Sequence, residues 1–270
     1  MNGTQDKEKN MSLMKAVCIA FSIYSKIPMP QFEWKDKDMR YHLIFFPFVG
    51  AVIGALIYGW GALCRMLELP AFVFALITAA IPLIVTGGFH VDGFMDTMDA
   101  FKSYKSREEK LMIMKDPHIG AFSVIMLAVY GLVYLAAVSL LQDESIGVFV
   151  LSFILSRILS AIAVLSFPQA KTEGMVHTFS ESADSRRGLV RALLIVELLV
   201  TIGGMLRFNL ILGITTALCL GLYFLYYYLR TKREFGGITG DTAGYFVTCS
   251  EVLAAVIGAV YAVVSGAMGS

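Results

Sequence analysis

The chain has 270 residues, of which 57% are hydrophobic and only 16% are charged, and its mean hydropathy is +0.70. Soluble domains carry about 25% charged residues, so this composition excludes an ordinary soluble domain and predicts an integral membrane protein. The formal net charge of +1 gives no reason to expect a nucleic-acid partner. The four cysteines stand singly, without the spacing of a zinc site or a disulfide framework.

Predominantly apolar runs along the chain predict an all-α polytopic bundle in the lipid bilayer, with residues 1–270 forming one membrane-embedded catalytic domain. Each run is long enough to cross a hydrocarbon core of about 30 Å as a helix. A shorter stretch, Ala16 to Ile27, contains Lys26 and predicts an interfacial or re-entrant helix instead. The seven predicted spans cover residues 43–63, 70–86, 119–141, 146–167, 189–206, 208–229 and 243–266.

Lysines and arginines are divided unevenly between the loops on the two sides of this bundle. Fourteen lie in loops on one side, whereas the other side has only Arg65 and Arg207. Positively charged loops stay in the cytoplasm. The imbalance therefore predicts a multi-pass protein of the cell (inner) membrane, with its long polar loops and its active site facing the cytoplasm.

The longest of these loops opens with an acidic motif directly after the predicted span 70–86. Asp92, Asp96 and Asp99 are spaced so that they fall on one face of a helix. Such close like charges repel unless a cation compensates them, and oxygen ligands without soft donors suit Mg²⁺, Mn²⁺ or Ca²⁺ rather than zinc. We predict that the three aspartates bind divalent metal, which substrate phosphates would share. A solvated acidic helix face is the alternative.

The residues around this motif extend the prediction. His90 has two open interpretations: phosphate binding or proton transfer, or a hydrogen bond at the membrane interface. Residues 106–109 (Ser-Arg-Glu-Glu) form a capping-box pattern, which predicts a short amphipathic helix. That helix should end near Pro117 and return Lys115 and Asp116 towards the acidic face.

Two further polar loops are candidates for substrate contacts. Residues 236–244 are rich in glycine, so backbone amides near Thr239 and Gly240 could bind phosphate. A tight turn followed by close helix packing is the alternative. Residues 168–188 form a loop that is long for a helix hairpin, and we expect it to cover substrate unless it is a simple charged connection.

Charged side chains within predicted spans are rare and often functional. Arg157 lies near the middle of one span, and Glu251 lies about two turns into the last one. Arg157 could clamp a phosphate in a functional cavity, or it could form a structural bridge with Glu251 or Glu197.

Several short motifs follow one another in a fixed order along nearly the whole chain. They are Ile27-Pro28-Met29-Pro30, Phe46-Pro47-Phe48-Val49-Gly50 with Gly54, Gly87-Gly88-Phe89-His90-Val91-Asp92-Gly93 with Asp96-Thr97 and Asp99, Ile113-Met114-Lys115-Asp116, Ser156-Arg157, Glu173-Gly174 and Thr239-Gly240-Asp241-Thr242. In this order they resemble the cobalamin synthase family, the adenosylcobinamide-GDP ribazoletransferases. The family usually has glycine shortly after the third aspartate, where this chain has Ala100-Phe101, and leucine then glycine after Gly-Asp-Thr, where it has Ala243-Gly244. These departures leave loop conformations open but remove no carboxylate.

The resemblance implies a reaction of late cobalamin biosynthesis. A hydroxyl of alpha-ribazole, or of its 5′-phosphate, attacks the phosphate that carries cobinamide in adenosylcobinamide-GDP, which releases GMP and forms adenosylcobalamin or its 5′-phosphate. It implies Mg²⁺ on Asp92, Asp96 and Asp99, with Asp116 and Asp241 as further catalytic residues. It also implies substrate or phosphate contacts from His90, Lys115, Arg157, Thr239, Gly240 and Glu251.

Two other classes of protein compete with this interpretation. A CDP-alcohol phosphotransferase also carries aspartates at the cytoplasmic boundary, in the pattern Asp-Gly-x-x-Ala-Arg. Here Asp92-Gly93 is followed by Phe94-Met95-Asp96-Thr97, which lacks the Ala-Arg pair. A secondary transporter would use Arg157 and Glu251 at mid-membrane, and transporters often contain internal repeats, of which we find no convincing instance. Gly50-x-x-x-Gly54 could bring helices together within a chain or in a homo-oligomer.

Overall fold

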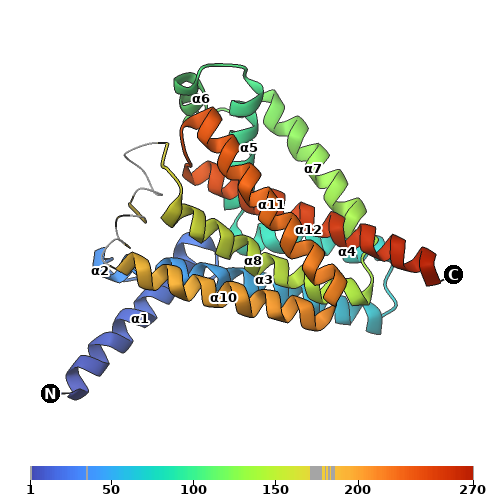
Figure 1. Ribbon diagram of the computed structural model, residues 1–270, viewed down its shortest axis with the longest axis horizontal. Helices are drawn as coiled ribbons and strands as arrows, with labels where there is room; N and C mark the ends of the chain where they lie inside the picture. The colour runs from blue at the N-terminus through green and yellow to red at the C-terminus, as the bar shows by residue number, and fades with distance from the viewer. Residues whose placement is uncertain are drawn as a thin grey trace.

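A computed structural model describes residues 2–34, 36–170, 178, 179, 181, 183 and 186–269 (Figure 1). The helices are α1 (Asn2–Tyr24), α2 (Asp36–Met39), α3 (His42–Met66), α4 (Ala71–Thr86), α5 (Phe89–Lys102), α6 (Arg107–Ile113), α7 (Ala121–Ser139), α8 (Asp143–Ser166), α10 (Arg187–Phe208), α11 (Leu210–Phe235) and α12 (Gly240–Gly269). Within these residues the β structure is limited to one bridge, between Gln169 and Ile238. The all-α prediction is confirmed.

Six of the described helices are long and apolar enough to cross a membrane, namely α3, α7, α8, α10, α11 and α12. They coincide with six of the seven predicted spans. The seventh, α4, meets the same test only together with α5, and the two helices are bent by 95° where they join. Because α5 is polar and sharply turned, we treat α4 as the span and α5 as a helix at the membrane boundary.

The N-terminal helix α1 is longer than the sequence predicted, because it begins at Asn2 and not near Ala16. Only its second half, Leu13–Tyr24, is apolar. Twelve residues are too short for a helix to cross a bilayer, which agrees with the predicted interfacial segment. In Figure 1, α1 points away from the bundle at its N-terminal end.

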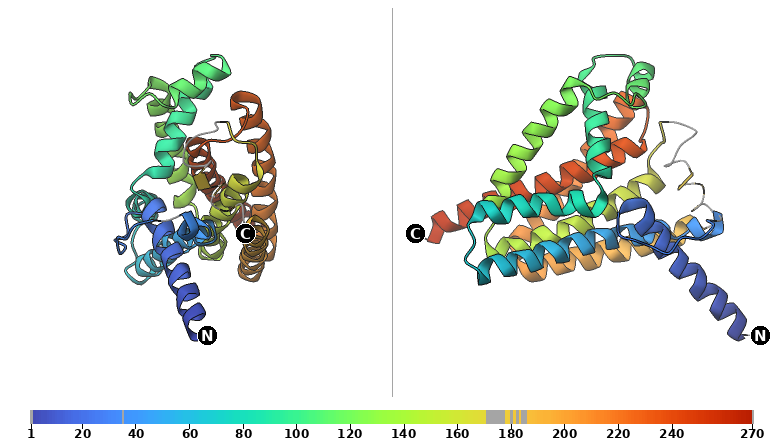
Figure 2. Two further views of the ribbon diagram at one scale, coloured as in Figure 1. Left: turned by 90° about the vertical axis from the view of Figure 1, so that its left-hand side faces the viewer. Right: turned by 180° about the vertical axis from the view of Figure 1, so that it is seen from behind.

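Helix α8 is the centre of the bundle, and α3, α10 and α12 pack around it (Figure 2). The α3–α8 contact depends on two glycines, since a Cβ added at Gly50 would lie 2.2 Å from the Phe153 carbonyl oxygen. One added at Gly54 would lie 2.7 Å from that of Val150. The Gly-x-x-x-Gly motif therefore brings helices together within the chain. Homo-oligomer formation stays a prediction.

The outer helices expose large apolar side chains, as expected for surfaces that face lipid. Leu132 on α7, Val200 on α10 and Leu222 on α11 are each more than 60% exposed. The acidic side chains of the predicted motif lie on α5, which follows α4 and packs against α12.

Paired glycines produce the sharp turn between α4 and α5. Gly87 ends α4 with φ +66°, and Gly88 precedes α5 with φ +79°, a backbone region that favours glycine. Helix α5 then crosses the start of α12, where a Cβ on Gly93 would lie 2.7 Å from the Asp241 carbonyl oxygen. Glycine at these positions thus brings the acidic motif against the glycine-rich residues 236–244.

Candidate active site

The acidic motif lies on α5, as the spacing of its aspartates predicts. Asp92 is in the first turn and exposed, whereas Asp96 and Asp99 are half-buried. Burial, together with the negative charges of Asp92, Asp241 and Asp99, raises the pKa of Asp96 to about 6. Asp241, which starts α12, therefore belongs to the same cluster of charges although it is far away in the sequence.

Asp99 has a structural contact that the sequence did not predict. One carboxylate oxygen accepts the Gly120 N–H at 2.9 Å, and the other accepts the Ser123 N–H at 2.9 Å. These amides begin α7, so Asp99 caps that helix and its charge faces the positive end of the helix dipole. Both oxygens have protein partners, which makes Asp99 less suited to metal than its neighbours on α5.

The loop after α6 returns to α5 through Gly120, whose N–H donates to Asp99, and no described contact joins Lys115 or Asp116 to the acidic motif. Helix α6 does begin with the capping box, since Ser106 N–H donates to Glu109 Oε2 at 3.0 Å and Glu109 N–H donates to Ser106 Oγ at 3.3 Å. After it, Lys115 and Asp116 are both exposed. The His118 backbone N–H and ring hydrogen-bond the Asp116 carboxylate and lower its pKa. Asp116 is not among the charges that act on Asp96.

The glycine-rich loop before α12 is a helix cap and a packing element. The Thr239 backbone N–H donates to Thr242 Oγ1 at 2.8 Å, and the Thr242 N–H donates to Thr239 Oγ1 at 3.2 Å. This reciprocal pair resembles a capping box. The Thr239 side chain is buried, so the structure supports the alternative of a turn with close packing more than a phosphate site formed by Thr239.

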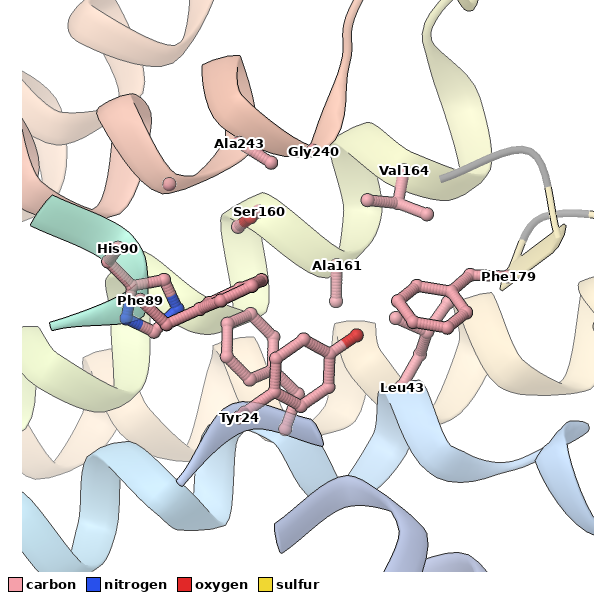
Figure 3. Close-up of a pocket in the computed structure, with 12 residues that line it drawn as sticks. Tyr24, Leu43, Phe89, His90, Ser160, Ala161, Val164, Phe179, Gly240 and Ala243 are labelled. Atoms are coloured by element: carbon pink, nitrogen blue, oxygen red, sulfur yellow. The ribbon is translucent and has the colours of Figure 1, made fainter. Parts of the chain in front are cut away.

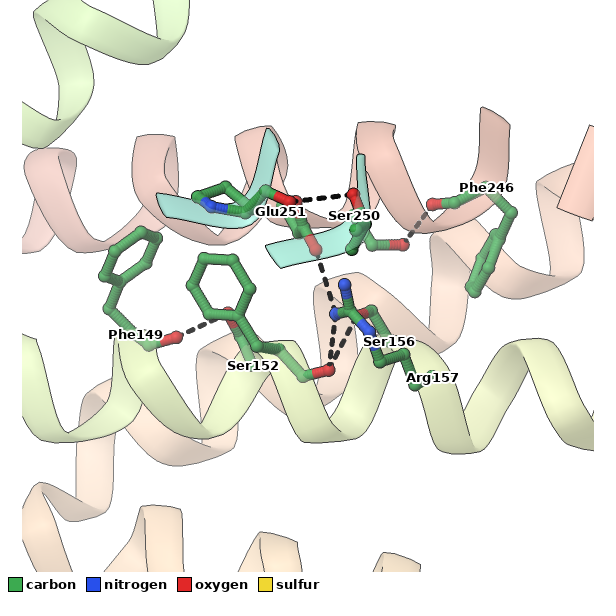
Figure 4. Close-up of polar contacts among 10 residues, drawn as sticks. Phe149, Ser152, Ser156, Arg157, Phe246, Ser250 and Glu251 are labelled. Carbon is green, nitrogen blue, oxygen red and sulfur yellow. Dashed lines mark hydrogen bonds and ion pairs between the residues drawn. The ribbon is translucent and has the colours of Figure 1, made fainter. Parts of the chain in front are cut away.

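Arg157 forms the structural bridge that the sequence left open, and its partner is Glu251 (Figure 4). Arg157 Nη1 donates to Glu251 Oε1 and to the Phe153 carbonyl oxygen, both at 2.9 Å. The guanidinium also lies over the Phe46 ring. Arg157 is 0% exposed and Glu251 is 5% exposed, so this structure shows the guanidinium in a buried ion pair, and the expected contact with a phosphate stays a prediction. Glu197, the other possible partner, lies on α10 beside a separate groove.

His90 is buried, whereas Asp92 on the same helix is exposed. It lines a narrow cavity of about 30 Å³ with Tyr24, Ser160 and Phe179 (Figure 3). Burial, followed by the positive charge of Arg157, holds the pKa of His90 well below its usual range, so the ring is neutral. Gly240 lines the same cavity. This volume has room for a few atoms of water size and is well below the roughly 300–1,000 Å³ of small-molecule sites, so phosphate contacts from His90 and Gly240 stay predictions.

A much larger pocket, of about 630 Å³, opens beside Asp92. It lies where the end of α1 meets the end of α4 and the first two turns of α5. Its polar lining residues are Ser22, Ser25, Lys26, Thr86 and Asp92. Ser22, Ser25 and Lys26 are not among the site residues predicted from the sequence. In the sequence, Lys26 is only a charge that interrupts an apolar segment. We refer to this cavity as the Lys26 pocket.

The donor set determines what kind of metal site this cluster can form. Throughout the part of the chain that the structure describes, no three His, Cys, Asp or Glu side chains converge closely enough to hold an ion alone. Magnesium usually binds through one or two carboxylates together with waters and substrate phosphates. Asp92, Asp96 and Asp241 are oxygen donors that share one field of negative charge, and Asp92 lines the open pocket, so one or two of these carboxylates fit that requirement.

The fold and the site together define a polytopic helical membrane protein. Its carboxylate cluster lies on α5 and at the start of α12, beside the ends of the membrane spans. Comparison with known proteins gives the family. Residues 16–259 match the family model of CobS, cobalamin-5-phosphate synthase, and the chain belongs to this family.

Several relatives named adenosylcobinamide-GDP ribazoletransferase match almost end to end. The protein of Lachnoclostridium phytofermentans is 41% identical over 90% of this chain and 93% of its own. Those of Desulfitobacterium hafniense and Clostridium perfringens are 34% and 32% identical, over 90% and 88% of this chain and 96% and 94% of their own. No solved structure gives a significant match.

Proposed function

We propose that this chain is an adenosylcobinamide-GDP ribazoletransferase that acts in the late assembly of the cobalamin nucleotide loop. The observation that supports this activity is the cluster of Asp92, Asp96 and Asp241, of which Asp92 lines the Lys26 pocket, in a chain of the cobalamin-5-phosphate synthase family. Family membership and the names of the relatives disfavour a CDP-alcohol phosphotransferase and a secondary transporter.

The reaction replaces the phosphoanhydride bond to GMP by a phosphate ester bond to ribazole. The hydroxyl oxygen of alpha-ribazole, or of its 5′-phosphate, forms a bond to the phosphorus that carries cobinamide. The bond from that phosphorus to the bridging oxygen breaks, and GMP leaves with the electron pair. The hydroxyl proton passes to a carboxylate oxygen of the cluster, which acts as general base.

Asp92, Asp96 and Asp241 would hold Mg²⁺ jointly with the diphosphate of the donor. When bound, the ion would neutralise negative charge on the attacked phosphate and on the leaving GMP. Asp99 is assigned to positioning, because its cap on α7 connects α5 to the next span. The excess of Lys and Arg in loops at this end of the bundle supports a cytoplasmic site in the cell membrane.

GMP release by the purified, detergent-solubilised protein tests this proposal. With adenosylcobinamide-GDP, alpha-ribazole and Mg²⁺ we expect turnover, and we expect EDTA to abolish it and added Mg²⁺ to restore it. Asp92→Asn and Asp241→Asn should lose most activity, whereas Asp143→Asn, an exposed acidic residue at the opposite end of the bundle, should not.

Undiminished turnover in EDTA would disprove the metal-dependent mechanism. CMP release from a CDP-alcohol, with no GMP from adenosylcobinamide-GDP, would instead support the phosphotransferase alternative. Isothermal titration with Mg²⁺ in the presence and absence of GDP separately tests joint binding, since a shared site predicts much weaker binding of Mg²⁺ alone.

A further inference from the structure

The Lys26 pocket contains a positive charge that the described fold does not use. Lys26 is exposed, and in the described part of the chain its ammonium group has no carboxylate partner. Asp92 lies on another wall of the same pocket. Opposite charges that line one pocket and form no ion pair with each other among the described residues leave room for a ligand that contacts both.

The position of Lys26 is set by the break between α4 and α5. Its backbone N–H donates to the Val85 carbonyl oxygen at 2.7 Å, which ties the end of α1 to the end of α4. Its aliphatic stem crosses Gly87, because a Cβ added there would lie 2.4 Å from Lys26 Cε. The residue is therefore held over the turn from which the acidic helix starts.

The walls of the pocket suit one half of the donor substrate. Ile23, Leu83 and Met95 provide apolar surface, and Lys26 and Asp92 provide opposite charges. A volume of about 630 Å³ is within the range of small-molecule sites, which is roughly 300–1,000 Å³. A nucleoside diphosphate has the matching chemistry, with an aromatic base, a sugar and a diphosphate that binds ammonium groups and divalent metal.

We infer that this pocket binds the guanosine diphosphate half of the donor, with Lys26 Nζ as the cation that contacts a phosphate oxygen. The inference rests on the proposed function and adds a subsite and a substrate-binding residue to it. The diphosphate lies between Lys26 and the metal held at Asp92, and the larger corrinoid stays outside the pocket. Lys26 acts on binding of the donor and makes no contact with the ribazole acceptor.

Substitution of Lys26 tests the subsite by kinetics and by binding. We expect Lys26→Gln to raise the KM for adenosylcobinamide-GDP about tenfold or more, the usual effect of losing one charged hydrogen bond. The KM for alpha-ribazole should stay unchanged, and Lys26→Arg should recover much of the loss. Lys105→Gln, an exposed lysine outside the pocket, serves as the matched control.

The paired glycines provide a second comparison that leaves Lys26 itself in place. Gly87→Ala and Gly88→Ala impose similar backbone strain, since both positions have positive φ. Only the methyl group at position 87 would collide with Lys26, because a Cβ at Gly88 has no atom within 4 Å. We therefore expect Gly87→Ala to weaken donor binding more than Gly88→Ala does. The comparison requires that the two variants unfold at similar temperatures.

Equilibrium dialysis of GDP with Mg²⁺ separates this inference from the proposed function. Wild-type protein should bind GDP, and Lys26→Gln should bind it about tenfold more weakly, whether or not GMP release is observed. An active wild type whose Lys26→Gln variant keeps both the donor KM and the GDP affinity would overturn the subsite and leave the function intact. A folded wild type that binds GDP but releases no GMP would support the subsite and contradict the function.

Discussion

The ion pair between Arg157 and Glu251 makes a quantitative prediction about the stability of the bundle. Both side chains are buried, at 0% and 5% exposure, and Nη1 and Oε1 are 2.9 Å apart. Removing one partner leaves the other charge in a low-dielectric interior, which costs about 3–5 kcal/mol. Replacing both by neutral groups of similar size costs much less, because no charge stays unpaired.

A double-mutant cycle measures this difference. We expect Arg157→Met and Glu251→Gln each to lower the free energy of unfolding by about 3 kcal/mol or more. The double variant should be more stable than the sum of the single losses predicts, with a coupling energy of roughly 2–3 kcal/mol. Unfolding in mixed detergent and SDS micelles, followed by circular dichroism, gives the four values.

Two results would refute this reasoning. Single losses below about 1 kcal/mol that add in the double variant would mean that the pair contributes no more than a surface ion pair. If the double variant folded with wild-type stability but released no GMP, Arg157 or Glu251 would contact substrate. That result would favour the alternative in which Arg157 clamps a phosphate. Retained GMP release would instead support the structural role.

Three further substitutions test the contacts that position the site, each by thermal unfolding in detergent. Gly50→Ala places a methyl group 2.2 Å from an α8 carbonyl oxygen and should cost about 1–3 kcal/mol or more, whereas Gly59→Ala, with open space around it, should be neutral or stabilising. Asp99→Ala removes the acceptor of two α7 amides and should cost about 0.5–2 kcal/mol, against at most about 1 kcal/mol for the exposed Asp143→Ala. Thr242→Val removes a hydroxyl from the cap of α12 and should cost about 1 kcal/mol, and equal stability would show that the cap contributes nothing.

The acidic motif illustrates how far spacing along one helix can be interpreted. Asp92, Asp96 and Asp99 do lie on α5, as their helical periodicity predicts. Helical periodicity does not predict the groups that these aspartates contact, because those groups belong to other helices. Asp99 faces the amides of α7, and Asp96 shares its field with Asp241 of α12. Metal binding itself stays a prediction.

The residues between α5 and α7 show the opposite outcome. The capping box of α6 was predicted correctly, since it depends on two side chains three residues apart. The approach of Asp116 to the acidic motif stays a prediction, since the described contact between this loop and α5 is made by Gly120. The path of a loop depends on what it packs against, which side-chain spacing does not reveal. The predicted substrate cover at residues 168–188 lies mostly outside the described residues, so it stays a prediction as well.

The sequence by itself determined the class of protein, because apolar runs, helical spacing and caps are local properties that no other part of the chain can alter. It also carried the ordered motifs that resemble the family to which the chain belongs. Tertiary structure alone decided which charges meet. Glycines at positions 50, 54, 93 and 244 let helices approach closely, and that approach pairs Arg157 with Glu251 and brings Asp241 to Asp96. Such contacts depend on interhelical distance, which has no signature in the spacing of residues along a single helix.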